Sequence, residues 1–199
     1  MCKFIRQMVN QYFGKDIPAS ELRDDVLIYL DTKQIQKAVT VIQQMKKESN
    51  ASSENARVLL VAADSGSIVT RPPTRLLAPA LAAVLRKSHH LIVGIVPGYT
   101  DTKAPKNLEL ALLPEFAGRV FILPVESAFT LLETVALIDQ ADLLVTGDTG
   151  VMHLATATKK VRQAETIGFA PKNSVKIVAI FGGTNPDIWG DSEPTLIVG

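Results

Sequence analysis

The segment of this chain with the clearest chemical potential is GDTGVMHLATA, residues 147–157. It follows an apolar run typical of a strand, and its own pattern predicts that a helix begins near Gly150. The first amides of a helix have no partner within it, so together with the helix dipole they attract phosphate. Asp148, Thr149 and His153 are suited to binding phosphate or sugar hydroxyls, and Gly150 lets a ligand approach the backbone. The plainer alternative is that Asp148 caps the helix and His153 is an ordinary surface histidine.

A second glycine-rich segment, FGGTNPDIWG, occupies residues 181–190 and also follows an apolar run. Gly182, Gly183 and Thr184 supply backbone donors and a hydroxyl group at the end of that run. Alone, a Gly-Gly pair is more often a turn than a phosphate site. The loops after the other apolar runs are also rich in small polar residues, and basic side chains accompany them: Arg71, Arg75, Lys103 and Lys106. Because ligands of open α/β sheets bind at the carboxyl ends of the strands, we expect these segments to share one edge.

The elements that must position these loops alternate between short apolar runs and amphipathic stretches from residue 57 onward. This alternation predicts an α/β fold, a Rossmann-like parallel sheet with helices on both faces. The predicted strands are Val58–Ala63, Leu91–Val96, Val120–Leu123, Leu143–Thr146 and Lys176–Phe181. The predicted helices are Leu76–Lys87, Asn107–Phe116, Ser127–Gln140 and Val151–Lys159.

In the helix at Ser127–Gln140, Leu131, Val135 and Ile138 share one face and Ser127 is the expected cap. The polar segment from Lys159 to Ser174 is longer than the usual link between a helix and a strand, which indicates a surface excursion.

The first 55 residues lack the alternation of apolar runs and amphipathic stretches, and they are predicted to form a helical linking segment before a domain at residues 56–199. Apolar residues recur there at helical spacing, at Ile35, Val39, Ile42 and Met45. Asp31 or Thr32 is placed to cap that helix.

Composition excludes several classes of protein. The chain has 199 residues, 47% of them hydrophobic and 21% charged, with a net charge of +1. These values indicate a globular protein and argue against a nucleic-acid binder, which would need a basic surplus. Cys2 is the only cysteine, and no His/Cys cluster has the spacing of a zinc site, so neither a disulfide nor a metal is expected. The sequence shows neither a signal peptide nor a membrane span, which favours a cytoplasmic protein.

Together, D-T-G-x-M-H-L-A and F-G-G-T-N-P-x-x-W-G resemble the donor-binding half of glycosyltransferase family nine, the heptosyltransferases of lipopolysaccharide biosynthesis. The resemblance extends roughly from Tyr12 to Gly190. It implies two Rossmann-like domains that face each other, of which this chain is similar to the carboxy-terminal one. A position at the inner face of the membrane is a further implication.

The resemblance assigns residues to the donor. Asp148, Thr149, Gly150 and His153 match the positions that hold the sugar and diphosphate. Ser65 and Ser67 lie in a segment similar to the family's phosphate loop, where Arg71 stands in for a lysine and Arg75 is a second choice. Gly182, Gly183 and Thr184 would add donors to the diphosphate. Tyr99, Thr100 and Asp101 remain equal candidates for the ribose.

The implied reaction is inverting transfer of a sugar from ADP-heptose or a related nucleotide sugar to a glycan or lipid-linked acceptor, without a metal or other cofactor. The general base is expected on a separate amino-terminal domain, so the resemblance implies no catalytic residue in this chain. A non-catalytic module that binds nucleotide sugars, or a truncated fragment of the enzyme, is the alternative. An aspartic protease, which also uses D-T-G, is a weaker alternative that a helix directly after Gly150 would exclude.

Overall fold

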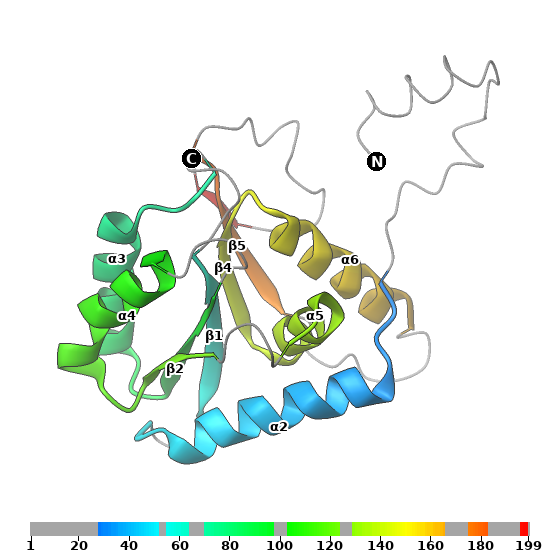
Figure 1. The fold of residues 1–199 in the computed structure, drawn as a ribbon, viewed down its shortest axis with the longest axis horizontal. Helices are drawn as coiled ribbons and strands as arrows, with labels where there is room; N and C mark the ends of the chain where they lie inside the picture. The colour runs from blue at the N-terminus through cyan, green and yellow to red at the C-terminus, as the bar shows by residue number, and fades with distance from the viewer. Residues whose placement is uncertain are drawn as a thin grey trace.

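The computed structural model describes residues 28–51, 55–63, 70–97, 103–123, 129–165, 175–182 and 196–198. Its strands form one parallel sheet in the order β3-β2-β1-β4-β5-β6 (Figure 1). Their bounds are β1 (Arg57–Ala62), β2 (Leu91–Val96), β3 (Val120–Ile122), β4 (Leu143–Gly147), β5 (Lys176–Ile180) and β6 (Leu196–Val198). The five predicted strands are therefore confirmed to within a residue at each end. The sequence analysis missed β6, whose three residues are too short to show a pattern.

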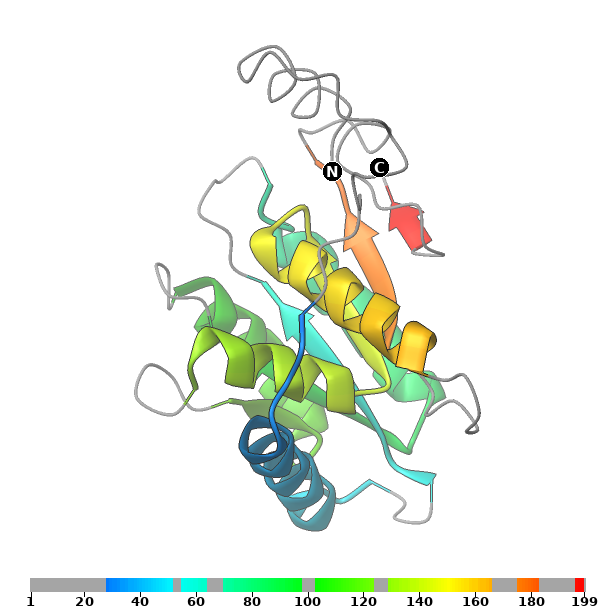
Figure 2. The same ribbon diagram turned by 90° about the vertical axis from the view of Figure 1, so that its right-hand side faces the viewer.

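Helices cover both faces of this sheet, as predicted. Their bounds are α2 (Thr32–Glu48), α3 (Thr74–Lys87), α4 (Lys103–Phe116), α5 (Leu131–Gln140) and α6 (Gly150–Glu165). Figure 2 looks onto the face that α2, α5 and α6 cover, while α3 and α4 lie behind the sheet. This arrangement is the doubly wound Rossmann-like fold.

The apolar run in β1 is continuous because both of its faces are buried. Val58 and Leu60 pack into the cluster formed with α2, α5 and α6, whereas Leu59 and Val61 pack into the cluster formed with α3 and α4. Alternate residues of a strand point to opposite faces, so one run supplies two hydrophobic cores.

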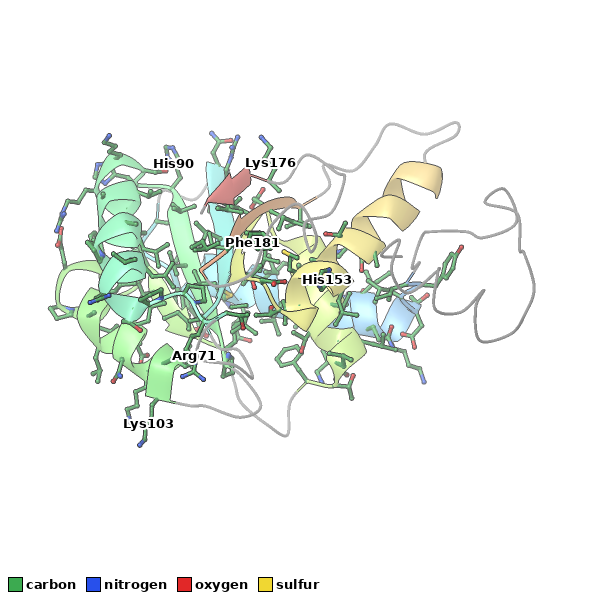
Figure 3. All side chains as sticks on the ribbon, turned by 90° about the horizontal axis from the view of Figure 1, so that it is seen from above. Arg71, His90, Lys103, His153, Lys176 and Phe181 are labelled. Carbon is green, nitrogen blue, oxygen red and sulfur yellow. The ribbon has the colours of Figure 1, made fainter. Side chains whose placement is uncertain are left out.

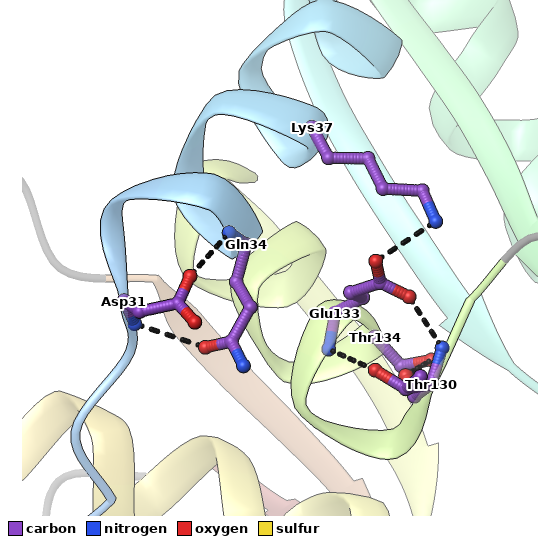
Figure 4. Close-up of polar contacts among 6 residues, drawn as sticks. All are labelled: Asp31, Gln34, Lys37, Thr130, Glu133 and Thr134. Carbon is purple, nitrogen blue, oxygen red and sulfur yellow. Dashed lines mark hydrogen bonds and ion pairs between the residues drawn. The ribbon is translucent and has the colours of Figure 1, made fainter.

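Helix α2, from the predicted linking segment, packs into the hydrophobic cluster that also contains residues of α5 and α6. Asp31 caps it by accepting a hydrogen bond of 2.7 Å from the Gln34 amide, so the first of the two predicted caps is correct. Met45 is buried, and its Cε would lie only 2.8 Å from a Cβ added to Gly94 in the sheet. Figure 4 shows the tie to α5, an ion pair of 2.9 Å between Lys37 Nζ and Glu133 Oε1. The division of the chain at residues 55 and 56 remains a prediction.

The structure corrects the predicted start of α5. The helix begins at Leu131, and its cap is Thr130, whose hydroxyl accepts a hydrogen bond from the Glu133 amide while the Glu133 carboxylate accepts one from the Thr130 amide. Ser127 lies outside the described residues. On the predicted apolar face Val135 and Ile138 are buried, but Leu131, the first residue of α5, is 49% exposed.

The structure also corrects the extent of α6, which continues to Glu165. The first part of the polar segment predicted as a surface excursion is therefore helical, and residues 166–174 lie outside the described part of the chain. The beginning of α6 at Gly150, directly after the D-T-G triplet and within a parallel sheet, makes the aspartic protease reading wrong. Within the described residues, no helix combines the length and apolar character needed to cross a bilayer.

Candidate functional site

The candidate site lies where the chain reverses its direction of winding across the sheet. Strands β1 and β4 are paired neighbours, yet β1 leads into α3 on one face and β4 leads into α6 on the other. Such a switch point is where open α/β sheets bind ligands, beyond the carboxyl ends of the strands. The loops that follow β1 and β4 are therefore the ones that matter most.

These two loops are in direct contact. A Cβ on Gly147, the last residue of β4, would overlap the carbonyl oxygen of Thr70 and lie 2.9 Å from Pro72 Cδ. Glycine is needed here because the segment after β1 crosses the end of β4 without room for a side chain. The crossing brings Arg71, between Thr70 and Pro72, to the edge at which Asp148 follows Gly147. Figure 3 looks down on this edge and labels Arg71 and His153.

Helix α6 presents its amino terminus at the same edge. The carbonyl oxygen of Thr149 accepts hydrogen bonds from the amides of Met152, at 3.0 Å, and His153, at 3.4 Å. These bonds form the first turn of the helix. An ideal Cβ on Gly150 meets no atom within 4 Å. The space beside the first helical residue is therefore open, and the first amides of a helix have no acceptor within it. This combination can accommodate an anion.

Asp148 and His153 face each other across this first turn. His153 Nε2 lies 3.7 Å from Asp148 Oδ1, and the two side chains are 44% and 8% exposed, respectively. The carboxylate is thus largely buried while the imidazole remains accessible. Thr149 directly precedes the first residue of α6, and Asp148 lies one residue earlier.

A residue that sequence reasoning missed lies beneath this turn. Thr146 is fully buried, and its hydroxyl lies 3.2 Å from the hydroxyl of Thr149 and donates a 3.2 Å hydrogen bond to the Gly147 carbonyl. Thr146 therefore holds the Thr149 side chain against the end of β4. The sequence signal for Thr146 was its position at the end of the apolar run LLVT, because a hydroxyl buried there needs a hydrogen-bond partner.

The remaining predicted residues are distributed as follows. Exposed Gly182 follows β5, which pairs with β4 up to Gly147, so it reaches the same edge. Arg75 is exposed in the first turn of α3. Outside the described residues lie Ser65, Ser67, Gly183 and Thr184, together with the ribose candidates Tyr99, Thr100 and Asp101. Within the described ranges, no three His, Cys, Asp or Glu side chains form a group that could hold a metal ion.

The fold and this edge define a Rossmann-like domain with a switch point at which such folds bind ligands. Residues 107–167, which include Asp148, Thr149, Gly150 and His153, match the model of glycosyltransferase family 9 (heptosyltransferase). The match confirms the resemblance for the segment that carries D-T-G-x-M-H-L-A, whereas the F-G-G-T motif at residues 181–190 lies outside the matched residues. No curated protein matches the chain.

Several solved structures share the fold. ADP-heptose lps heptosyltransferase II of E. coli is 20% identical with a TM-score of 0.60, over 92% of this chain and 45% of that one. A family 9 glycosyl transferase from Veillonella parvula DSM 2008 is 16% identical with a TM-score of 0.63, over 96% and 46%. E. coli heptosyltransferase WaaC with ADP is 15% identical with a TM-score of 0.56, over 96% and 49%. The chain therefore spans about half the length of these proteins.

Proposed function

We propose that this chain is the donor-binding half of a glycosyltransferase of the heptosyltransferase type. Its substrate would be ADP-heptose or a related ADP-sugar, bound at the edge where β1 and β4 end. The observation that carries the proposal is the open amino terminus of α6 at the switch point, within the segment that matches the family model. The solved structure of E. coli heptosyltransferase WaaC is a structure with ADP, which supports an adenine nucleotide as part of the donor.

The charges at this edge suit a departing diphosphate. As the bond between the sugar and ADP breaks, negative charge develops on the phosphate oxygens, and fixed donors aimed at that charge lower the barrier. In this proposal the amides of Gly150 and Val151 face the diphosphate, and the guanidinium of Arg71 supplies a full positive charge. Ser65, Ser67, Gly182, Gly183 and Thr184 are proposed as further contacts.

Asp148 and His153 have complementary proposed roles. The largely buried carboxylate lies 3.7 Å from the accessible imidazole and can orient it toward the ligand. His153 would then donate a hydrogen bond to the diphosphate or to a sugar hydroxyl. Neither residue is proposed as the catalytic base.

The proposed transfer is inverting and metal-independent, with a sugar hydroxyl of a lipopolysaccharide core glycan as acceptor. That hydroxyl attacks the anomeric carbon from the face opposite ADP, and its proton passes to a general base on a separate amino-terminal domain. Because the chain spans about half of its structural relatives, a second candidate is a module that binds nucleotide sugars without catalysing transfer.

Calorimetric titration of the chain with ADP, UDP and inorganic phosphate tests the donor site. We expect binding that prefers ADP, weakened about tenfold or more by His153→Ala, the loss of about one charge-assisted hydrogen bond. Lys33→Ala, on the exposed surface of α2, is the control and should bind as the wild type does. Equal binding of ADP and UDP would contradict the proposal. Sugar transfer observed only after an amino-terminal domain is added would separate the enzyme from the non-catalytic module.

A further inference from the structure

The outward surface of the α3 and α4 layer is apolar along its middle. Leu76, Val84 and Leu110 are 63%, 45% and 57% exposed. Further exposed apolar residues of the two helices are Pro79, Ala80 and Ala83 in α3 and Ala111 and Pro114 in α4, while polar Asn107 is exposed one turn before Leu110. We call the eight apolar residues the apolar strip. α3 and α4 lie side by side on this side of the sheet (Figures 1 and 3), so their exposed faces form one surface.

The outward face of α2 shows what an ordinary solvent-facing helix of this protein looks like. Its exposed residues within the helix are all polar: Thr32, Lys33, Gln36, Thr40, Gln43, Gln44, Lys47 and Glu48. Isolated exposed leucines need no explanation, but an apolar strip that continues over two neighbouring helices does. In the α2, α5 and α6 layer, the large apolar side chains that are exposed among the described helical residues are Leu131 and Leu132, both in the first turn of α5. The longer strip that continues over α3 and α4 indicates that this face meets something other than water.

Basic residues border the apolar strip at both ends. Arg75 and Lys106 are exposed in the first turns of α3 and α4, and Lys87 is exposed at the carboxyl end of α3. Every charged residue of α3 is basic. The exposed carboxylate Glu115 of α4 is engaged by Arg86, with two hydrogen bonds of 2.6 Å that also tie the two helices together. Half-buried Glu109 is the other carboxylate of α4. The two helices together carry five basic residues (Arg75, Arg86, Lys87, Lys103 and Lys106) against two acidic ones, so the surface combines exposed apolar side chains with an excess of positive charge.

We propose that the outer face of α3 and α4 docks on a lipid surface that carries anionic headgroups. Apolar side chains bordered by Lys and Arg are the combination that partitions into the interface of an anionic bilayer, where the chains enter the headgroup region and the cations meet phosphates. The parallel helices would lie flat on the membrane.

A second copy of the chain fits this face less well. A twofold axis through the strip would set the two α3 helices antiparallel and bring Arg75 of one copy toward Lys87 of the other. Like charges across an interface are destabilising, and the neighbouring Glu115 is already paired with Arg86. Charge complementarity therefore favours an anionic surface. This inference does not depend on the proposed sugar transfer.

Vesicle sedimentation tests the proposal with the full chain. We expect the wild type to sediment with vesicles of equal parts phosphatidylglycerol and phosphatidylcholine, much less with phosphatidylcholine alone, and less with the mixed vesicles as salt is raised. Leu76→Ser/Val84→Ser/Leu110→Ser should lower the partition coefficient about tenfold. Lys87→Glu/Lys106→Glu should lower it about thirtyfold or more, at roughly fivefold for each charge removed.

The matched control is Leu131→Ser/Leu132→Ser, which changes two exposed leucines of α5 in the other helix layer. It should sediment as the wild type does, and circular dichroism should show that all variants are folded. The proposal is overturned if mixed vesicles bind no more protein than phosphatidylcholine, or if the control loses as much binding as the strip variants. Light scattering that reveals a dimer dissociated by the triple serine variant, without vesicle binding, would assign the face to a second copy instead.

Discussion

Gly147 lies directly against the backbone carbonyl of Thr70, so the end of β4 and the loop after β1 are held together without an intervening side chain. This contact fixes the relative positions of Arg71 and the D-T-G triplet. The two segments come from different crossovers of the sheet, and their meeting point is the centre of the proposed donor site.

Gly147→Ala should therefore disturb both stability and the site. The added methyl would overlap backbone, which cannot yield as a flexible side chain can, and overpacking of this kind costs about 1–3 kcal/mol. Urea denaturation should show the loss, and calorimetry should show weaker ADP binding because Arg71 moves with its loop. An unchanged free energy of unfolding would contradict the close contact.

Gly150→Ala is the opposite case and forms a matched pair with Gly147→Ala. A Cβ at Gly150 meets nothing within 4 Å, and positive φ is found among the described glycines only at Gly118. Replacing a helical glycine with alanine then raises stability by up to about 1 kcal/mol. The same methyl should weaken ADP binding, because it fills the space proposed for the diphosphate. Unweakened ADP binding would place the nucleotide elsewhere.

Thr146→Val tests the support beneath the helix. Valine keeps the shape of the side chain but leaves the Thr149 hydroxyl without its contact, and we expect a loss of about 1 kcal/mol in the free energy of unfolding. ADP affinity should fall as Thr149 reorients. Thr146→Ser retains the hydroxyl and should preserve most of the affinity, so equal losses in the two variants would show that only packing matters here.

Glu133 gives the contact between α2 and α5 a defined pH dependence. The hydrogen bond from the Thr130 amide, followed by that from Lys37, lowers the pKa of the Glu133 carboxyl below its ordinary value. A lowered folded-state pKa contributes stability above the unfolded-state value of about 4.3, and that contribution disappears as the pH falls through the folded-state pKa. The difference in unfolding free energy between the wild type and Glu133→Gln should therefore shrink as the pH drops below about 4.3. A difference that grows in acid would contradict the assignment.

The fold could be predicted from the sequence because its strands are buried on both faces. Residues 91–96, LIVGIV, contain no polar residue that would interrupt a buried strand, and β2 has the predicted bounds. The start of α5 was also readable: Thr130 is followed three residues later by Glu133, whereas Ser127 has Thr130 at that position and so cannot form the reciprocal pair. Thr130 with Glu133 was therefore the better predictor of the start of α5 than Ser127.

The candidate site was only partly predictable. The D-T-G triplet and His153 are close in sequence, and a helix beginning at Gly150 brings them together by its geometry alone. The contact of Gly147 with Thr70 depends on how two crossovers leave the sheet, and no local pattern encodes it. The same is true where the Asp142 carboxylate accepts a 2.8 Å hydrogen bond from the Val58 amide, joining the beginning of β1 to β4.

The place of α2 in the core has a practical consequence for dissecting this protein. Ala38, Ile42 and Met45 cover one face of the sheet together with α5, so removing the helix would bare a wide apolar surface. A recombinant domain intended for crystallography should begin before Asp31, so that it keeps the reciprocal hydrogen bonds between Asp31 and Gln34 that cap α2. A shorter version beginning at residue 56 should express largely as aggregate, and limited proteolysis of the full chain should leave α2 attached to the sheet.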